Sequence, residues 1–89
     1  MTICSGLEGG VATRTYAVAE RHALRIELVE EADVLPAVAY AYRELGQRVE
    51  PAAAVVLAAV RAGLSVDDET VLVVTGGDLQ PSLLKEALT

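Results

Sequence analysis

The sequence predicts an incomplete α/β domain, part of a three-layer α/β/α body with a mostly parallel sheet. Two segments favour this class. Residues 51–62 predict a helix that is apolar on every side, and residues 70–75 predict a strand that is apolar on both faces. Both segments need cover all round, and a chain of 89 residues holds too few layers to supply it. We therefore expect residues 1–89 to form a single partial domain, the inner layer of a larger body.

The composition excludes several classes of function. The chain has a net charge of −6, and its seven basic residues are scattered, which argues against a nucleic-acid partner. Its single cysteine forms no internal disulfide and favours a reducing, cytoplasmic setting. No apolar run approaches the roughly 20 residues that span a bilayer, so no membrane segment is expected. One histidine far from one cysteine predicts no metal site.

The first half of the chain predicts a loop, two helices and one strand. Residues 1–12 are rich in glycine and predict a loop, and Thr13 is placed to cap a short helix that runs to about residue 23. Residues 24–29 alternate apolar and charged side chains, as a half-exposed strand does. Asp33 is the expected N-cap of a helix over residues 34–45, which Gly46 ends.

The sequence of the second half predicts alternating strands and helices. The connections between them are long enough for right-handed parallel crossovers. Pro51 suits the first position of the apolar helix, because its missing N–H costs little there. The expected elements are a very short strand at 47–50, a helix at 51–62 ended by Gly63, an acidic loop at 66–69, a buried strand at 70–75, a turn at 76–77 and a last amphipathic helix from Pro81.

Two places carry candidate chemistry. Thr75-Gly76-Gly77-Asp78 follows the predicted buried strand, and ligands bind at the carboxyl ends of strands in open α/β sheets. The same four residues are also compatible with a plain glycine turn. Glu50 precedes the apolar helix, where its carboxylate either stabilises the helix dipole or faces a cavity at the sheet edge. The residues leave both pairs of alternatives open.

Three other reactive side chains have no partners in the sequence pattern. His22 lacks a nearby nucleophile or carboxylate pattern and is expected on a helix surface. Cys4 lies in a loop with no fixed base beside it. Lys85 is expected on the exposed side of the last helix, so it is a poor candidate for a Schiff base. We therefore expect no catalytic residue in this chain.

Three stretches, read in order, are similar to a known family. They are Thr2-Ile3-Cys4-Ser5-Gly6-Leu7, Glu50-Pro51-Ala52-Ala53-Ala54 and Val73-Val74-Thr75-Gly76-Gly77-Asp78. In order and separation they resemble the C-terminal part of fold type II (tryptophan synthase β-like) pyridoxal-phosphate enzymes, especially the serine/threonine dehydratases, which are ammonia-lyases. The family more often has Ser or Cys at the position of Thr75, Asn at that of Asp78 and Gly at that of Ala53.

The resemblance implies a cofactor site that the residues alone do not. Thr75 would donate or accept a hydrogen bond at the pyridine nitrogen of pyridoxal 5'-phosphate, and Glu50 would lie beside the cofactor at the mouth of the site. Gly76 and Gly77 would leave room for the ring. The family's Schiff-base lysine and its phosphate loop belong to an N-terminal part that has no counterpart in these 89 residues.

The expected function is therefore that of a C-terminal piece of an amino-acid ammonia-lyase, inactive alone. Its partners would be the lysine-bearing N-terminal part, a small amino-acid substrate and, in isolation, other copies of itself. A non-enzymatic α/β interaction module that uses the apolar helix as an oligomer interface is the alternative. A small anion-binding domain around Gly76 and Gly77 is a third, which the charge of Asp78 opposes.

Overall fold

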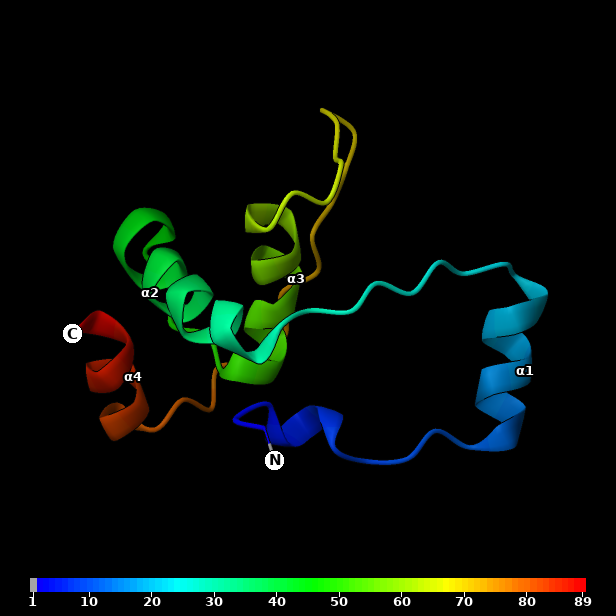
Figure 1. Cartoon of the computed structure of the whole chain (residues 1–89), viewed down its shortest axis with the longest axis horizontal. Coiled ribbons are helices and arrows are strands. Elements are labelled where there is room, and N and C mark those ends of the chain that lie inside the picture. The colour runs from blue at the N-terminus through cyan, green and yellow to red at the C-terminus, as the bar shows by residue number, and fades with distance from the viewer. Residues whose placement is uncertain (1) are drawn as a thin grey trace.

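The chain folds as a set of short helices joined by extended segments. A computed structural model describes residues 2–89, and Figure 1 shows its helices in order along the chain. The helices are η1 (Ser5–Leu7), α1 (Thr13–Arg21), η2 (Glu31–Asp33), α2 (Val34–Leu45), α3 (Pro51–Arg61) and α4 (Pro81–Leu88), where η marks a 3-10 turn.

The core lies between α2 and α3, with α4 against α2. Most of its members are alanine or valine, and these small side chains let the two helix axes approach closely. Leu79, just before α4, closes the core from the side. The buried members of this core are Ala37, Val38, Ala41, Val49, Ala53, Ala54, Leu57, Ala58 and Leu79.

The helix ends follow the sequence signals in part. Gly46 ends α2 in the left-handed conformation (φ 64°), and Pro51 occupies the first turn of α3, as predicted. The predicted cap at Thr13 is wrong, because Ala12 occupies the N-cap position of α1. Asp33 occupies the N-cap position of α2 as predicted, but its side chain makes no capping hydrogen bond.

An arm, defined here as residues 9–28, extends away from the packed helices. It runs out through residues 9–12, forms α1 and returns through residues 22–28, so that α1 stands apart from α2, α3 and α4 (Figure 1). No residue of α1 is buried. A helix of nine residues is marginal in water without tertiary contacts, so α1 depends on cover that the described chain does not give it.

The predicted three-layer α/β/α class is wrong. None of residues 2–89 lies in a β-strand, and the three segments expected to pair, 24–29, 47–50 and 70–75, do not form a ladder. A single backbone hydrogen bond, from the Glu50 N–H to the Gly76 carbonyl oxygen (3.2 Å), joins segment 47–50 to the residue that follows segment 70–75. Strand pairing needs a neighbour whose backbone lies alongside for several residues, and no two of the three segments run together for that length.

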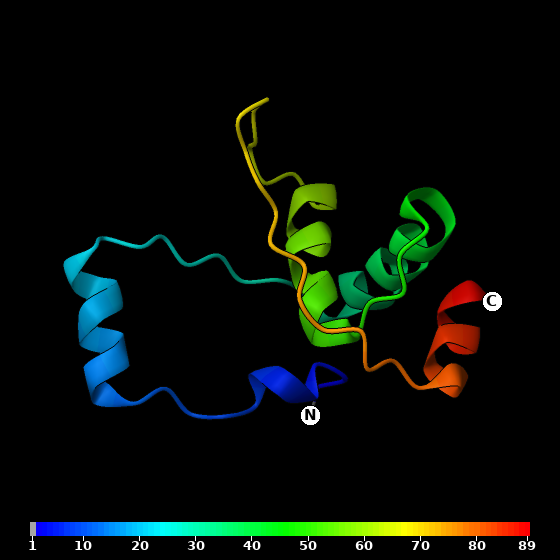
Figure 2. The ribbon, with the colours of Figure 1, turned by 180° about the vertical axis from the view of Figure 1, so that it is seen from behind.

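The segment expected to be a buried strand is instead exposed. Val71 and Val73 expose 82% and 69% of their surface, whereas Leu72 and Val74, on the opposite face, expose 38% and 42%. The alternation has the period of a strand, because successive side chains of an extended backbone point to opposite faces. Residues 71–75 thus have the geometry of a strand edge, and they pass along α3 without a neighbouring strand (Figure 2).

Exposure is high for a chain of this mass. The accessible surface is 6792 Å² for 9.3 kDa, whereas a folded monomer of this mass exposes about 5,000 Å². The radius of gyration is 14.0 Å, against about 12 Å for a compact domain of this length. The excess surface, about 1,800 Å², belongs largely to the arm and to the extended segment after α3.

Candidate functional site

Residues from three distant parts of the chain meet at the N-terminal end of α3. A recess of about 530 Å³ lies there, between the η1 turn, the first turn of α3 and the end of the exposed segment 71–75. Its lining includes three of the four predicted site residues. The recess is lined by Gly6, Leu7, Glu50, Ala52, Ala53, Thr75 and Gly76.

Glu50 and Gly76 are in direct contact. The Glu50 N–H donates to the Gly76 carbonyl oxygen, and the Glu50 carboxylate occupies the space where a side chain at residue 76 would lie. A Cβ atom placed on Gly76 would stand 1.5 Å from Glu50 Oε1. A side chain at residue 76 would therefore displace this carboxylate, whereas the backbone φ of Gly76 is not in the left-handed region.

The fourth predicted residue, Gly77, lies outside the recess. Its nearest neighbour is the backbone carbonyl of Arg48, which a Cβ atom at residue 77 would meet at 3.4 Å, an ordinary van der Waals contact. The Arg48 guanidinium donates to the Leu79 carbonyl oxygen. These contacts hold the turn after Thr75 against the segment that leads into α3.

The η1 side of the recess is tethered by Glu31. Its carboxylate accepts hydrogen bonds from the Thr2 hydroxyl and from the Ile3 N–H, the latter at 3.0 Å. These two donors lower the pKa of Glu31, because they stabilise its ionised form. The Thr2 hydroxyl also accepts from the Cys4 N–H at 3.1 Å. These hydrogen bonds hold the first of the three matching stretches, residues 2–7, at the recess.

Cys4 lies behind the recess and not in it. Its side chain is buried, and burial raises the pKa of the thiol because the thiolate is poorly solvated there. A thiol with a raised pKa is a weak nucleophile at neutral pH. Cys4 therefore packs as a small apolar side chain under the η1 turn.

Four residues of the recess were not among the predicted site residues. Gly6 and Leu7 come from the first matching stretch, and Ala52 and Ala53 come from the second. A Cβ atom on Gly6 would lie 3.2 Å from the Cβ of Ala52, so the η1 turn rests closely on α3. The signal was present in the sequence, because both stretches belong to the resemblance, but nothing in the residues alone placed them beside Thr75.

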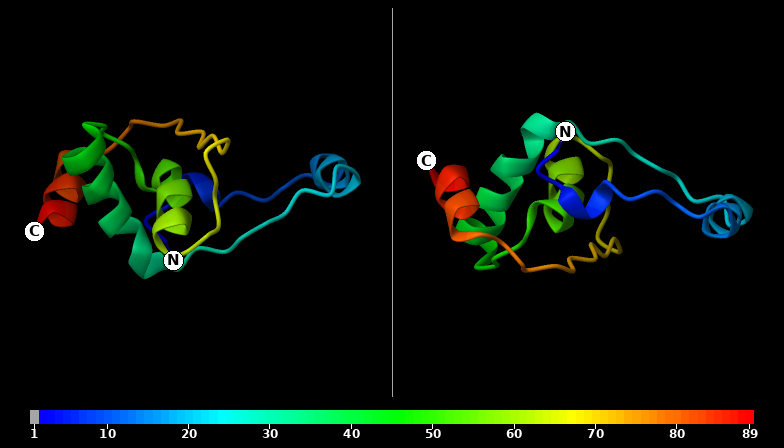
Figure 3. Two further views of the ribbon diagram at one scale, coloured as in Figure 1. Left: turned by 90° about the horizontal axis from the view of Figure 1, so that it is seen from above. Right: turned by 90° about the horizontal axis from the view of Figure 1, so that it is seen from below.

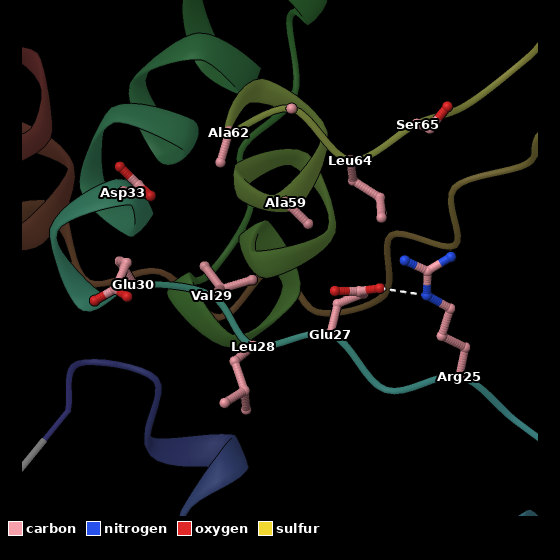
Figure 4. A pocket seen from close by; sticks show the side chains of 11 residues that line it. Arg25, Glu27, Leu28, Val29, Glu30, Asp33, Ala59, Ala62, Leu64 and Ser65 are labelled. Atoms are coloured by element: carbon pink, nitrogen blue, oxygen red, sulfur yellow. Dashed lines mark ion pairs between the residues drawn. The ribbon is translucent and has the colours of Figure 1, made fainter.

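A second pocket, of about 390 Å³, lies between the end of the arm and the C-terminal end of α3 (Figure 4). Its charged residues include Arg25 and Glu27, which form an ion pair at 2.5 Å, with Glu30 and Asp33 further along the rim. The pair is solvent-exposed, and such pairs contribute little. None of the predicted site residues lines this pocket, so the recess beside Glu50 is the stronger candidate.

Metal ligation and membrane insertion have no support in the described chain. Within residues 2–89, no group of three or more His, Cys, Asp or Glu side chains is placed to hold a metal ion. No helix in the same range has the length and hydropathy that crossing a bilayer requires.

The recess suits one edge of a small planar ligand. Its volume is within the range of small-molecule sites, and its walls are mainly Gly, Ala and Leu. Two of its lining residues have polar side chains, the half-buried Glu50 and the exposed Thr75. No Lys, Arg or His is among its lining residues in the part of the chain described, so a phosphate group on such a ligand needs a partner elsewhere.

No family model, curated protein or solved structure matches this chain. The resemblance to the dehydratases therefore stays a prediction, carried by the three stretches and by their meeting at one recess.

Proposed function

We propose that this chain supplies the pyridine-nitrogen side of a pyridoxal 5'-phosphate site in a serine/threonine dehydratase-like ammonia-lyase. One observation carries the proposal. Residues 6–7, 50, 52–53 and 75–76, which belong to the three stretches that resemble this family, line a single recess although up to 70 positions separate them. A reducing, cytoplasmic compartment is part of the proposal, since the chain has one cysteine.

Thr75 has the central role in this proposal. A hydroxyl is both donor and acceptor, so it can donate a hydrogen bond to an unprotonated ring nitrogen. It brings no negative charge that would hold a proton on that nitrogen, as an aspartate would. The ring nitrogen therefore stays largely neutral, which makes a milder electron sink suited to elimination of a hydroxyl group.

Glu50 and Gly76 shape the space around the ring. The hydrogen bond from the Glu50 N–H to Gly76 fixes the end of segment 71–75 relative to the first turn of α3. The Glu50 carboxylate then borders both this recess and a smaller one of about 200 Å³ beside Asp78. Glu50 thus stands at the mouth of the proposed site, where it would orient the ring and the amino group of a small amino-acid substrate.

The remaining parts of the site must come from another polypeptide segment. Bound pyridoxal phosphate supplies the electron sink for chemistry at the α-carbon of an amino acid. Among residues 2–89, no lysine to hold the cofactor and no basic group for its phosphate lines the recess, and Lys85 lies on α4, outside the lining. The proposed partner is the lysine-bearing N-terminal part of such an enzyme, and the chain alone is expected to be inactive.

Complementation tests the proposal. Residues 1–89 are mixed with the separately produced lysine-bearing N-terminal part of a serine/threonine dehydratase, pyridoxal phosphate and L-serine or L-threonine. We expect the visible absorbance of lysine-bound cofactor and the release of a 2-keto acid and ammonia. Thr75→Val should abolish most of this activity, by roughly 100-fold for a lost polar contact to the reacting system, and Thr75→Ser should retain it.

Thr15→Val on the exposed face of α1 is the matched control and should leave the activity unchanged. Two results would contradict the proposal. One is the absence of any cofactor band or keto acid with every N-terminal part tried. The other is tight, saturable binding of pyridoxal phosphate by a monomer of residues 1–89, since that would show a complete site in this chain alone.

A second candidate function is supported by the exposed surface. A non-enzymatic interaction module needs a large apolar face, and the chain exposes about 1,800 Å² more than a compact monomer. The face of α3 that holds Ala54, Leu57 and Ala58 is buried against the rest of the core and is not available to such an interface. A stable association with no response to any N-terminal part would favour this candidate.

A further inference from the structure

We propose that two copies of this chain exchange arms, so that the arm of each copy (residues 9–28) docks on the exposed edge (residues 71–75) of the other. The proposal concerns the chain without cofactor or any other polypeptide, and it does not depend on the function proposed above. It rests on the backbone, the surface area, the charges and the position of the arm.

The exposed edge has the form of an unfilled pairing site. Within residues 2–89, no backbone hydrogen bond is formed by the N–H or C=O groups of residues 71–75. Its side chains are four consecutive Val and Leu residues followed by Thr75, a composition typical of strands. An extended, apolar edge with open donors and acceptors recruits another extended segment.

The arm contains a segment of matching form. Residues 24–28 alternate apolar and charged side chains, and the three apolar ones, Leu24, Ile26 and Leu28, expose 64%, 73% and 96% of their surface. Alternation with period two places these three on one face of an extended strand. Pairing with the edge would set them beside Val71 and Val73 on the same face, as cross-strand neighbours.

Helix α1 would cover that face. Tyr16 on α1 exposes 55% of its surface, and α1 has no buried residue. The helix and the strand segment are joined by a short turn at residues 22–23, so they would arrive together as one unit. Docking would give α1 the tertiary contacts that a nine-residue helix needs.

The arm of a chain does not reach the edge of the same chain. Residues 24–30 return along one side of α3, and residues 71–76 pass along its other side, as the two end-on views show (Figure 3). Val29 at the base of the arm packs against the core, which holds the arm on its own side. An arm that covers this edge therefore belongs to a second copy.

The charges favour docking of an arm on an edge over pairing of two edges. The arm carries three arginines, Arg14, Arg21 and Arg25, and only two glutamates, whereas residues 66–78 hold four carboxylates and no basic side chain. Pairing of edge with edge would bring the acidic loop at 67–69 of one copy near Asp78 of the other, which like charge opposes. Arm on edge brings opposite charges together.

The available area is sufficient. A stable interface buries about 800 Å² on each partner, and a reciprocal exchange forms two such contacts, so each chain contributes both an arm and an edge. The surface excess of about 1,800 Å² per chain is close to twice that area. An exchanged dimer would thus bring the exposure of each chain to that of a compact domain.

Charge reversal on each surface tests the exchange. The mass of the wild-type chain is measured by sedimentation equilibrium at low salt, and we expect a dimer. Arg14→Glu with Arg21→Glu makes the arm acidic, and Asp67→Lys with Asp68→Lys brings the net charge of residues 66–78 from −4 to zero. We expect each double variant alone to dissociate at least about tenfold more readily, because the arm variant sets an acidic arm against an acidic edge and the edge variant loses the attraction between arm and edge.

An equimolar mixture of the two double variants should recover a dimer of one copy of each, since the acidic arm then meets the edge beside the two new lysines and the basic arm meets the acidic edge. Glu86→Lys on the exposed face of α4 is the control and should leave the dissociation constant unchanged. Val73→Lys tests the edge without touching the arm and should dissociate the dimer, whereas Leu45→Lys at the end of α2 should not.

Three results would overturn the proposal. The first is a wild-type chain that stays monomeric at every concentration. The second is a dimer whose dissociation constant does not respond to either double variant or to Val73→Lys. The third is a mixture of folded double variants, verified by far-ultraviolet circular dichroism, that fails to dimerise.

Discussion

The packed helices and the extended segments of this molecule have similar hydrophobicity but very different exposure. Helices α2 and α3 bury their alanines and valines against one another, while the valines of residues 71–74 and the apolar residues of 24–28 stay exposed. The difference lies in the backbone. A helix satisfies its own N–H and C=O groups and needs only a packing partner, whereas an extended segment also needs a neighbour for its backbone.

The largest effect is expected where packing is tightest. Ala54 is completely buried in the core that α3 shares with α2, so Ala54→Leu should lower the free energy of unfolding by about 1–3 kcal/mol through overpacking. Ala17→Leu makes the same change on exposed α1 and should alter stability by less than about 0.5 kcal/mol. Urea unfolding followed by circular dichroism measures both.

Equal changes in the free energy of unfolding for Ala54→Leu and Ala17→Leu would contradict the difference in packing between the core and α1. In that case α1 would be packed as tightly as the core in solution, which an exchanged dimer would also produce. The comparison is therefore made at concentrations below and above the dissociation constant, and the cost at residue 17 should depend on concentration.

The next effect concerns the end of α2. Gly46 has a φ of 64°, a region that residues with a side chain enter at a cost, so Gly46→Ala should destabilise the chain by about 1 kcal/mol. Gly10→Ala is the matched control in the arm, where φ is not in that region and no atom lies within 4 Å of the added Cβ. Thermal unfolding should separate the two variants clearly. If Gly10→Ala were as destabilising as Gly46→Ala, the arm would be packed in solution, contrary to the structure.

A smaller effect on stability is expected at the recess, where the two regions meet. Gly76→Ala forces the Glu50 carboxylate out of its place, because the new Cβ would lie 1.5 Å from Oε1. The side chain of Glu50 is flexible, so the cost in stability should stay below about 1 kcal/mol. In the complementation assay, however, the activity should fall at least about tenfold, since the shape of the recess changes.

Gly77→Ala is the control for this change, because its Cβ meets only an ordinary contact with the backbone of Arg48. In the Glu50→Ala background, Gly76→Ala should cost no further stability. A cost that persists in that background would mean that the close approach of Glu50 is not the reason for glycine at residue 76.

The smallest effect is a pH dependence of the η1 tether. The hydrogen bonds from Thr2 and Ile3 lower the pKa of Glu31, so the tether is present above the ordinary carboxyl pKa and is lost as the pH falls through the lowered value. Loss of the tether should expose Cys4, which is buried beneath the loop. The labelling rate of its thiol, corrected for the thiolate fraction, should therefore rise on acidification.

Glu31→Gln should label fast at every pH and lose this dependence, while Glu30→Gln, one residue earlier on the exposed surface, should behave as the wild type. A pH profile that is the same in Glu31→Gln as in the wild type would show that another group controls the loop.

The sequence predicted helices well and pairing poorly. Pro51, Gly46 and Pro81 mark helix ends through local chemistry, and these ends lie where local rules put them. The apolar pattern of residues 70–75 predicted a buried strand, which is wrong, because a strand also requires a partner and no local pattern names one. The prediction of a sheet was wrong for that reason.

The site was predictable to the extent that it depended on order along the chain. Glu50, Thr75 and Gly76 were predicted as site residues, and all three line the recess. Gly77 lies outside the recess, beside the backbone carbonyl of Arg48. The part played by Glu31 was not foreseen, because a carboxylate that binds a loop 28 residues away leaves no periodic or motif signal. Long-range hydrogen bonds of this kind become visible only in three dimensions.

The single backbone hydrogen bond between Glu50 and Gly76 has a mechanical consequence. It connects the exposed edge to the first turn of α3, which is anchored in the core, and it does so at the wall of the recess. Any strand that pairs with residues 71–75 pulls on this bond and thereby sets the spacing between Thr75 and Glu50. Pairing of the edge with another strand and the geometry of the candidate site are therefore coupled through the position of Gly76.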